Sequence, residues 1–337
     1  MVITRTPFRI SFFGGGTDYP VWFEKNGGAV LSTTINKYCY VITRYLPPFW
    51  ECKYRLRYTA HEEVNRIDQI KHPSIRESLN HVNFNHGVEV QHNTDIPGMS
   101  GLGSSSSFTV GFLRSLYALR GEEISKEKLA MDAIHVEQKR IGESVGSQDQ
   151  TIAAFGGFRK IGFDKNGKIN VQLVPISDER KNELEENLQL FFVGFPRRAS
   201  EIAEEQIKNT PKKETELFAM RKMVDDAHAI LLDQKKSLDD FGELLHESWQ
   251  IKRTLSSKIS NPIIDEIYET ALSAGALGGK VLGAGGGGFM LFYAPKVFQE
   301  KVRSKLSGLL EVPFQFEKFG TKVIYQLPEG KWGYNVR

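Results

Sequence analysis

Three clusters of glycine, each next to hydroxyl or charged side chains, are the parts of this sequence best suited to chemistry. The middle cluster, PGMSGLGSSSS at residues 97–107, lies between a strand-like segment and a stretch with helical spacing. A helix N-terminus has unpaired backbone N–H groups and a partial positive charge, so a glycine loop leading into one can surround an anion. The serine hydroxyls at 104–107 can cap that helix, contact a phosphate or bind Mg²⁺. We therefore favour a phosphate-binding loop over a flexible loop that ends in a capping serine.

The first cluster, in RTPFRISFFGGGTDYP at residues 5–20, combines an arginine and an aspartate with three glycines. Arg9 lies within an apolar strand-like segment, and a cation in such a place needs an anionic partner. Asp18 follows the glycines closely. At this position an aspartate is either an ordinary turn residue or a group that faces a ligand.

The last cluster is the richest in glycine, with eight of the fourteen residues at 275–288. Its GAGGGG at 283–288 has the GxGxxG spacing of a dinucleotide-binding turn, but that turn must open a helix, and the FMLFY that follows is strand-like. GALGGKV at 275–281 fails as a Walker loop because Val281 stands where Ser or Thr is required. A tight hairpin and a loop against a ligand are both compatible with this cluster.

The composition excludes several classes of protein. The 337 residues include 44 Lys and Arg against 41 Asp and Glu, a net charge of +3 that is too balanced for a general nucleic-acid binder. Cys39 and Cys52, the two cysteines, are too few for a disulfide framework or a zinc knuckle. No apolar run approaches the ~18–20 residues of a membrane span, and the N-terminal segment resembles a strand more than a signal peptide. We expect a reduced, cytoplasmic protein that binds neither nucleic acid nor membrane.

About two domains must position these clusters, since 337 residues exceed one domain of roughly 150 residues. The first half is mainly strand-like, with two helices that begin near residues 108 and 125. After residue 176 come a charged helix, a buried strand, a long helical region at 199–256 and glycine-flanked strands with further helices. We therefore predict an α+β fold with an N-terminal domain at 1–176 and a C-terminal domain at 177–337. The predicted strands are 1–13, 29–32, 38–46, 53–59, 87–92, 188–193, 280–282, 289–293 and 314–316.

Taken together, the three clusters resemble the three motifs of the GHMP kinase superfamily, named for galactokinase, homoserine kinase, mevalonate kinase and phosphomevalonate kinase. RTPFRISFFGGGTDYP is similar to the first motif, PGMSGLGSSSS to the ATP phosphate loop, and KVLGAGGGGFMLF at 280–292 to the third. The motifs occur in the family's order and cover the chain from end to end. The resemblance implies a two-domain GHMP kinase fold with the active site in the interdomain cleft, and ATP and Mg²⁺ as cofactors.

The resemblance also implies catalytic and metal-binding roles. Asp149, in GSQDQ, matches the catalytic aspartate that accepts a hydrogen bond or the proton of the attacking hydroxyl, and Arg9 matches its cationic partner. Glu137 falls in the apolar stripe near the end of its helix, where burial and the helix dipole both disfavour a carboxylate unless a cation binds it. Glu137 also matches the position of the family's Mg²⁺ glutamate. Ser105 is the hydroxyl ligand that we choose for the same ion, with Ser104 next.

For ATP, the resemblance implies contacts along the whole middle loop, and for the sugar it implies a hydroxyl acceptor at Asp18. A substrate that already bears a phosphate needs cations, and Arg198, beside a serine at the start of a helix, is the best candidate. Arg55, Arg57, Arg197 and Lys252 are the others. The predicted ATP contacts are Gly98, Ser100, Gly101, Leu102, Gly103, Ser104, Ser105 and Ser106. The predicted substrate contacts are Asp18, Gly15, Gly16, Arg198, Arg57, Gly285 and Gly286.

Within the superfamily the chain most resembles the heptose 7-phosphate kinases, through FFGGGTD, GSQDQTIAAFGGF at 146–158 and VGFPRRASEI at 193–202. This implies transfer of phosphate from ATP to the anomeric hydroxyl of D-glycero-D-manno-heptose 7-phosphate, giving a 1,7-bisphosphate for nucleotide-activated heptose and surface glycans. Gly15 and Gly16 stand where galactokinases usually carry Glu-His, which disfavours galactose. The alternatives are a kinase for another sugar, such as fucose or galactose, and a GHMP-fold protein that senses nucleotide or sugar without catalysis. A homodimer is compatible with each of these functions.

Overall fold

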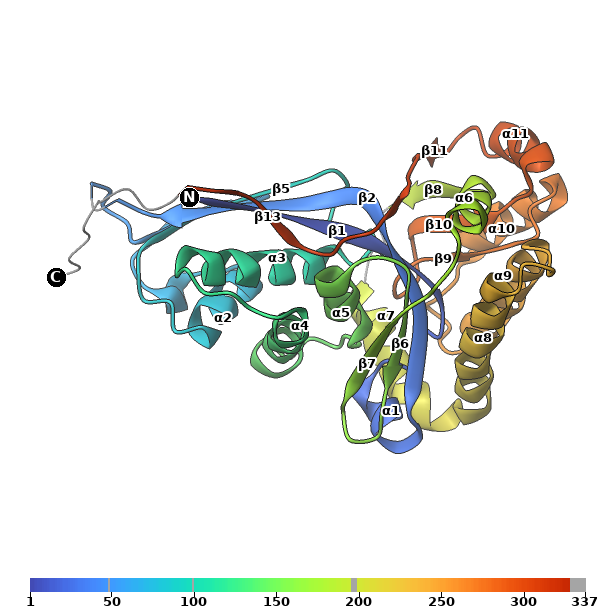
Figure 1. Ribbon diagram of the computed structural model, residues 1–337, viewed down its shortest axis with the longest axis horizontal. Helices are drawn as coiled ribbons and strands as arrows, with labels where there is room; N and C mark the ends of the chain where they lie inside the picture. The colour runs from blue at the N-terminus through green and yellow to red at the C-terminus, as the bar shows by residue number, and fades with distance from the viewer. Residues whose placement is uncertain (48, 99, 195–198, 328–337) are drawn as a thin grey trace.

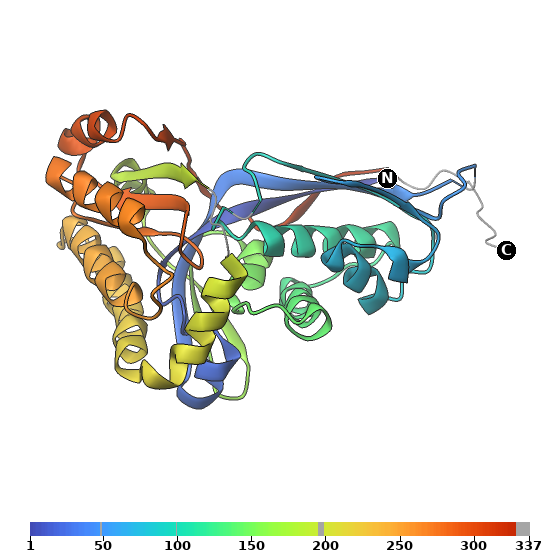
Figure 2. The same cartoon turned by 180° about the vertical axis from the view of Figure 1, so that it is seen from behind.

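Two lobes make up the protein in a computed structural model that describes residues 1–47, 49–98, 100–194 and 199–327 (Figure 1). The first lobe is built on a nine-stranded sheet and the second on a four-stranded sheet. Seen from behind, helix α7 (Ala199–Asn209) crosses the junction between the lobes (Figure 2). The predicted α+β class is confirmed.

Strands β1 (Val2–Phe13) and β2 (Gly28–Tyr45) form the centre of the first sheet. Both are rich in β-branched and aromatic residues, which suit a buried pleated surface, and they pair antiparallel from Val2–Thr43 to Phe13–Leu31. The main path of the sheet runs β13-β1-β2-β5-β3-β4, while β6 and β12 also pair with β2, and β7 pairs with β6. The other strands are β3 (Tyr54–Arg57), β4 (His61–Val64), β5 (Val88–Thr94), β6 (Arg159–Phe163), β7 (Ile169–Leu173), β12 (Phe316–Glu317) and β13 (Lys322–Gln326).

Helix α3 (Ser104–Leu119) packs against β1 and β2 and is buried along most of its length. It begins after Gly103, whose left-handed backbone conformation (φ 77°) suits glycine and which provides no side-chain cap. Helices α2, α4 and α5 lie on the same side of the sheet as α3 (Figure 1). The other helices of this lobe are α1 (Pro20–Asn26), α2 (Pro73–His81), α4 (Lys126–His135) and α5 (Gln148–Phe155), with a short 3₁₀ turn at Ile67–Gln69.

The four-stranded sheet of the second lobe has the order β11-β8-β10-β9, and all its pairings are antiparallel. Helix α9 packs on β9 and β10, and α8 packs on α9. The strands are β8 (Leu188–Gly194), β9 (Gly278–Val281), β10 (Gly288–Tyr293) and β11 (Leu310–Glu311). The helices besides α7 are α6 (Asp178–Glu186), α8 (Glu214–Leu232), α9 (Asp239–Lys252), α10 (Pro262–Ala274) and α11 (Lys296–Lys305), with a 3₁₀ turn at Thr210–Lys212.

Two features differ from what the sequence predicts. The proposed division at residue 176 falls just before α6, but β12 and β13 near the C-terminal end return to the first sheet and pair with β2 and β1. The helix predicted at 125–141 is α4 followed by a π-helical turn at Val136–Ile141, which ends at the left-handed Gly142. Such π turns often occur at functional sites, and this one carries Glu137.

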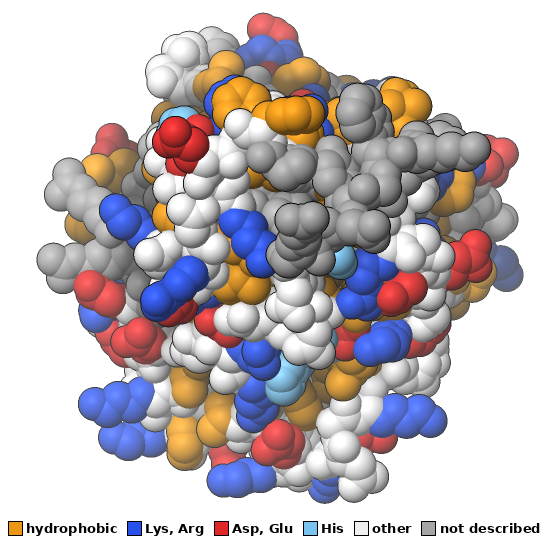
Figure 3. Space-filling model, turned by 90° about the vertical axis from the view of Figure 1, so that its left-hand side faces the viewer, with side chains coloured by type: hydrophobic (Ala, Val, Ile, Leu, Met, Phe, Trp, Pro, Cys, Tyr) orange, Lys and Arg blue, Asp and Glu red, His pale blue; other side chains and the backbone are white. Residues whose placement is uncertain are grey.

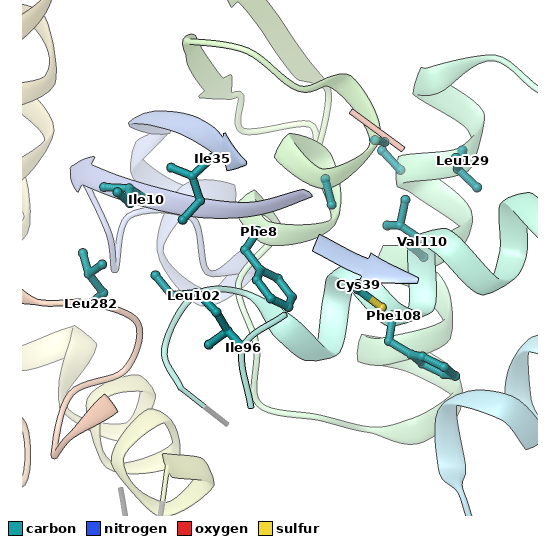
Figure 4. Close-up of a cluster of buried hydrophobic side chains, with 14 of the residues drawn as sticks. Phe8, Ile10, Ile35, Cys39, Ile96, Leu102, Phe108, Val110, Leu129 and Leu282 are labelled. Atoms are coloured by element: carbon teal, nitrogen blue, oxygen red, sulfur yellow. The ribbon is translucent and has the colours of Figure 1, made fainter. Parts of the chain in front are cut away.

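Buried apolar side chains connect the two lobes. Leu282, which follows β9 of the second lobe, lies in the same buried cluster as Ile10, Ile96 and Leu102 of the first lobe (Figure 4). Burying this surface favours one fixed arrangement of the lobes. Of the helices in the described ranges, none is long and apolar enough to cross a membrane. On the end face of the first lobe, acidic and basic side chains are interspersed (Figure 3).

Candidate active site

A cavity of about 660 Å³ lies between the lobes, which is the size of a site for a small molecule. The first lobe contributes the end of β1, the glycine turn after it and the segment 142–149. The second lobe contributes α7, the end of α9, β9 and the turn after β9. The charged residues of the wall are Arg9, Asp18, Glu143, Asp149, Glu204, Lys252 and Lys280.

Arg9 and Asp149 form a two-bonded ion pair at this cavity. Arg9 Nε donates to Asp149 Oδ1 at 2.8 Å and Nη2 donates to Oδ2 at 2.6 Å, while Nη1 donates to the carbonyl oxygen of Gly101 at 2.5 Å. The Arg9 side chain is only 5% exposed, whereas Asp149 keeps 24% and can still meet a ligand. A β-carbon on Gly103 would lie 3.4 Å from Asp149 Oδ2, so the pair lies directly against the start of α3.

Asp18 is a buried carboxyl group held by backbone N–H groups. Its Oδ1 accepts from Gly16 N at 2.9 Å and its Oδ2 from Gln148 N at 3.4 Å. A β-carbon on Gly146 would lie 1.8 Å from Asp18 Oδ2, so a glycine is required there. Burial and, to a smaller extent, the charge of Asp149 raise the pKa of Asp18, although the backbone hydrogen bonds oppose the rise. A carboxyl group in this setting can accept a hydrogen bond from a ligand hydroxyl.

Two buried lysines of the second lobe face the same cavity. Lys252, the last residue of α9, donates from Nζ to the carbonyl oxygen of Gly283 at 2.6 Å. Lys280, on β9, donates to the carbonyl oxygens of Ser11 and Phe12 at 2.9 and 2.7 Å and so ties this lobe to β1. Burial is the main cause of a lowered pKa in both side chains, to about 8 for Lys252.

Glu137 lies beneath the first turn of α3 and is fully buried. Its Oε2 accepts from Ser106 Oγ at 2.8 Å and from the side-chain amide of Gln150. Its Oε1 is buried without a hydrogen-bond partner among the described residues. Burial, assisted by the charge of Glu143, raises the pKa of Glu137 to about 7. An orphaned carboxylate oxygen in this position is a fitting ligand for a divalent cation.

The phosphate-loop segment fits an anion. The first turn of α3 has no side-chain cap, and Ser100 Oγ is buried without a partner in the described part of the chain. A β-carbon on Gly98 would have no described heavy atom within 4 Å, so there is free space beside this residue. These features leave backbone N–H groups and a hydroxyl for a phosphate.

The last glycine cluster packs against that loop. A β-carbon on Gly101 would lie 2.5 Å from the carbonyl oxygen of Leu282, and one on Gly283 would lie 2.7 Å from the Cα of Gly101. A β-carbon on Gly288 would lie 2.3 Å from the carbonyl oxygen of Ser100. The cluster contains the turn of the antiparallel β9–β10 hairpin and opens no helix, and its glycines also let this turn touch the backbone of the phosphate loop.

The structure brings most of the predicted residues to this region but not all of them. Gly15 and Gly16 line the cavity beside Asp18. Gly285 and Gly286 instead pack on Ile259 and Ile202, and the cavity is lined by Gly283 and Ala284.

Among the candidate ligands on charged or hydroxyl side chains that the structure describes, two do not meet the site as predicted. Arg57 is exposed on β3 and does not line the cavity. Ser105 is exposed, and the serine that contacts Glu137 is Ser106. Arg198 lies outside the described residues. Sequence reasoning missed Lys280, although a lysine inside an apolar strand is the same signal that singled out Arg9.

Family models match both lobes. Residues 70–157 match the model described as "GHMP kinases N terminal domain", and residues 227–309 match "GHMP kinases C terminal". The first match includes the phosphate loop, Glu137 and Asp149, and the second includes Lys252, Lys280 and the last glycine cluster.

Curated relatives and solved structures agree with these matches. The chain is 31% identical to D-glycero-alpha-D-manno-heptose 7-phosphate kinase of Campylobacter jejuni, over 95% of this chain and 97% of that protein. It is 32% identical to mevalonate kinase of Pyrococcus horikoshii over 70% of this chain and 69% of that protein. The crystal structure of a D-glycero-D-manno-heptose 1-phosphate kinase from Bacteroides thetaiotaomicron superposes with a TM-score of 0.79 at 24% identity, covering 97% of this chain and all of that one.

Proposed function

Because this chain belongs to the GHMP kinase family, we propose that it transfers the γ-phosphoryl group of ATP to the anomeric hydroxyl of D-glycero-D-manno-heptose 7-phosphate. The observation that carries this proposal is the Arg9–Asp149 pair, which lies against the start of α3 and lines the same cavity as the buried carboxyl group of Asp18. This arrangement joins a candidate base and a hydroxyl acceptor in one cavity, and the base lies next to a segment that fits a phosphate. The 1,7-bisphosphate product would supply the synthesis of nucleotide-activated heptose for surface glycans.

Asp149 is the candidate base. The two bonds from Arg9 fix the orientation of its carboxylate, and its remaining exposure lets it reach a hydroxyl in the cavity. It would accept the hydrogen bond, and in the transfer the proton, of the attacking hydroxyl. Arg9 then stabilises negative charge at the reacting centre while it holds the base in place.

Asp18 is the candidate for orienting the sugar. Its two carboxyl oxygens are anchored by backbone N–H groups from the glycine turn and from the start of α5, so its position is fixed before any ligand binds. Fixed hydrogen-bond partners reduce the cost of placing a hydroxyl next to the base. This favours a polyhydroxylated substrate.

ATP and Mg²⁺ fit the residues around the start of α3. The uncapped first turn and Ser100 would hold the phosphates, and Glu137 with Ser106 would hold the metal ion. We choose Ser106 over Ser105 because its hydroxyl already contacts Glu137. When bound, Mg²⁺ supplies positive charge that neutralises the phosphates.

The choice of a heptose phosphate rests on the full-length similarity to the Campylobacter jejuni protein. The name of that relative places the phosphate of the sugar at position 7, whereas the name of the Bacteroides thetaiotaomicron structure places it at position 1. We follow the first because its identity is higher, 31% against 24%, at a similar coverage of both chains.

The substrate is tested by ADP release with Mg²⁺, ATP and a panel of heptose 7-phosphate, heptose 1-phosphate, fucose, galactose and mevalonate. We expect the highest kcat/KM with heptose 7-phosphate. Release of ADP with an unphosphorylated sugar, and none with heptose 7-phosphate, would show that the substrate assignment is wrong.

The site is tested by Asp149→Asn, with Asp226→Asn as a control, because Asp226 pairs with Lys222 on the surface of α8. Loss of the base should lower kcat by about 10³-fold and leave the Kd for ATP nearly unchanged, while the control keeps wild-type activity. An Asp149→Asn protein with full activity would exclude this role.

A further inference from the structure

Lys252 is a buried cation without an anionic partner in the described structure. The residue is 5% exposed, and the carbonyl oxygen of Gly283 accepts one hydrogen bond from its Nζ. Among the described residues, no carboxylate lies within ion-pair distance of this Nζ. An ammonium group has three N–H donors, so two donors remain for a ligand in the cavity that Lys252 lines.

The position of Lys252 is close to the reacting centre. Gly283, which accepts its hydrogen bond, packs directly on Gly101 of the phosphate loop. The carbonyl oxygen of Gly101 in turn accepts from Arg9, which holds Asp149. A short series of contacts therefore places the Lys252 ammonium on the second-lobe wall, across from the candidate base.

The charges around Lys252 keep its ammonium group protonated, and its hydrogen bonds leave N–H donors that an anion could accept. Burial, and next the charge of Arg9, lower the pKa of Lys252 to about 8, while Asp18 and Asp149 act in the opposite direction. The lysine thus remains largely protonated at neutral pH. Lys280, whose charge repels that of Lys252, donates hydrogen bonds to two carbonyl oxygens of β1. Arg9 has already given three N–H groups to Asp149 and Gly101. Lys252 therefore keeps two N–H donors, one more than Lys280 and as many as Arg9, but unlike Arg9 it has no ion-pair partner among the described residues.

We propose that Lys252 binds the non-bridging oxygens of the phosphoryl group during transfer and is a catalytic residue supplied by the second lobe. The inference rests on the proposed kinase function. In the transfer, the bond from the acceptor oxygen to phosphorus forms as the bond from phosphorus to ADP breaks with its electron pair. The hydroxyl proton goes to Asp149, and Lys252 keeps its own protons and contributes only charge.

The Lys252 ammonium group could also bind the non-reacting phosphate of the substrate. Kinetic measurements distinguish this role from binding to the transferred phosphoryl group. Lys252→Met and Lys252→Arg are assayed for kcat and KM with heptose 7-phosphate and with unphosphorylated heptose at high concentration. Lys258→Met is the matched control, since Lys258 pairs with Glu201 and Glu205 outside the cavity. Circular dichroism and the Kd for ADP show that each variant is folded.

We expect Lys252→Met to lower kcat by about 100-fold with both acceptors, with KM changed by less than about threefold. Lys252→Arg should recover part of kcat, and Lys258→Met should match the wild type. An unchanged kcat overturns the proposal. So does a higher KM that is confined to the phosphorylated acceptor, because it would assign Lys252 to the non-reacting phosphate.

The substrate assignment and this proposal fail in different ways. If wild-type protein phosphorylates another sugar from the panel, the heptose assignment is wrong, and the Lys252 variants are compared on that sugar. The Lys252 proposal fails when the variants, folded and able to bind ADP, keep wild-type kcat on whichever acceptor the wild type uses, or when their only defect is a higher KM for a phosphorylated acceptor.

Discussion

Replacing Lys252 by methionine should make the ligand-free protein more stable at neutral pH. Lowering the pKa of this side chain from 10.5 to about 8 corresponds to about 3 kcal/mol of unfavourable charge burial in the folded state, since each pKa unit is worth about 1.4 kcal/mol. Methionine has a similar length and no charge. It leaves the carbonyl oxygen of Gly283 without its hydrogen bond, at a cost of about 1 kcal/mol. We expect a net gain of about 2 kcal/mol.

The gain should depend on pH in a defined direction. Below pH 8 Lys252 is protonated in both states, so the wild type carries the full penalty of burying the charge. Between pH 8 and 10.5 the folded protein binds fewer protons than the unfolded chain, and the stability that wild type lacks is recovered as pH rises. The advantage of Lys252→Met should therefore be largest at pH 7 and shrink toward pH 10. Other groups titrate alike in both proteins and cancel in the difference.

Urea unfolding followed by circular dichroism at pH 7, 8.5 and 9.5 measures this difference, with Lys258→Met as the control for loss of an ion-paired lysine. A less stable Lys252→Met protein at pH 7 would refute the reasoning, and so would a stability difference that does not change with pH. Together with a lowered kcat, the expected result would show that Lys252 serves activity and lowers the stability of the folded protein.

Three further substitutions test the rest of the site. Arg9→Met leaves Asp149 without its partner and should lower the free energy of unfolding by about 3 kcal/mol in urea; a loss under about 1 kcal/mol contradicts the importance of the pair. Glu137→Gln should raise the Mg²⁺ concentration needed for half-maximal ADP release by at least about tenfold, and an unchanged Mg²⁺ titration argues against a metal ligand there. Gly101→Ala forces a β-carbon to within 2.5 Å of the Leu282 carbonyl oxygen and should weaken ATP binding by about tenfold in calorimetry. Gly308→Ala, whose β-carbon would meet no described atom within 4 Å and which lies outside the cavity, should not weaken it, and equal effects of the two would exclude packing as the cause.

The parts of the site that the sequence predicts are those in which local chemistry is unusual. Arg9 stands out as a cation in an apolar strand, and the structure pairs it with Asp149 across 140 positions of sequence. Glu137 stands out as a carboxylate in an apolar helical stripe, and the structure buries it completely. In both cases a burial cost that is visible in the sequence indicates a partner, because an uncompensated buried charge is strongly unfavourable.

The parts that sequence reasoning misplaced depend on helix phase or on distant pairing. The serine that faces Glu137 depends on which side of α3 is buried, and a shift of one residue rotates the side chain by about 100°. Ser106 rather than Ser105 therefore meets the carboxylate. Strand β13 pairs with β1 although more than 300 residues separate Val2 from Gln326, and no local pattern encodes that pairing. The alternating pattern around Arg57 correctly predicts a strand. That this strand lies away from the cavity follows only from the order of strands in the sheet.

The last glycine cluster supports the phosphate loop from the second lobe. Gly283 and Gly288 allow the turn before β10 to lie against Ser100 and Gly101, so the backbone of the phosphate loop is supported from the second lobe. Lys280 fixes the same lobe to the end of β1, where the glycine turn to Asp18 begins. The phosphate loop and the glycine turn are thus both held by β9 and the turn after it. Because packed interfaces resist continuous deformation, the distance between the phosphate loop and the glycine turn is set by contacts between the lobes as much as by either lobe alone.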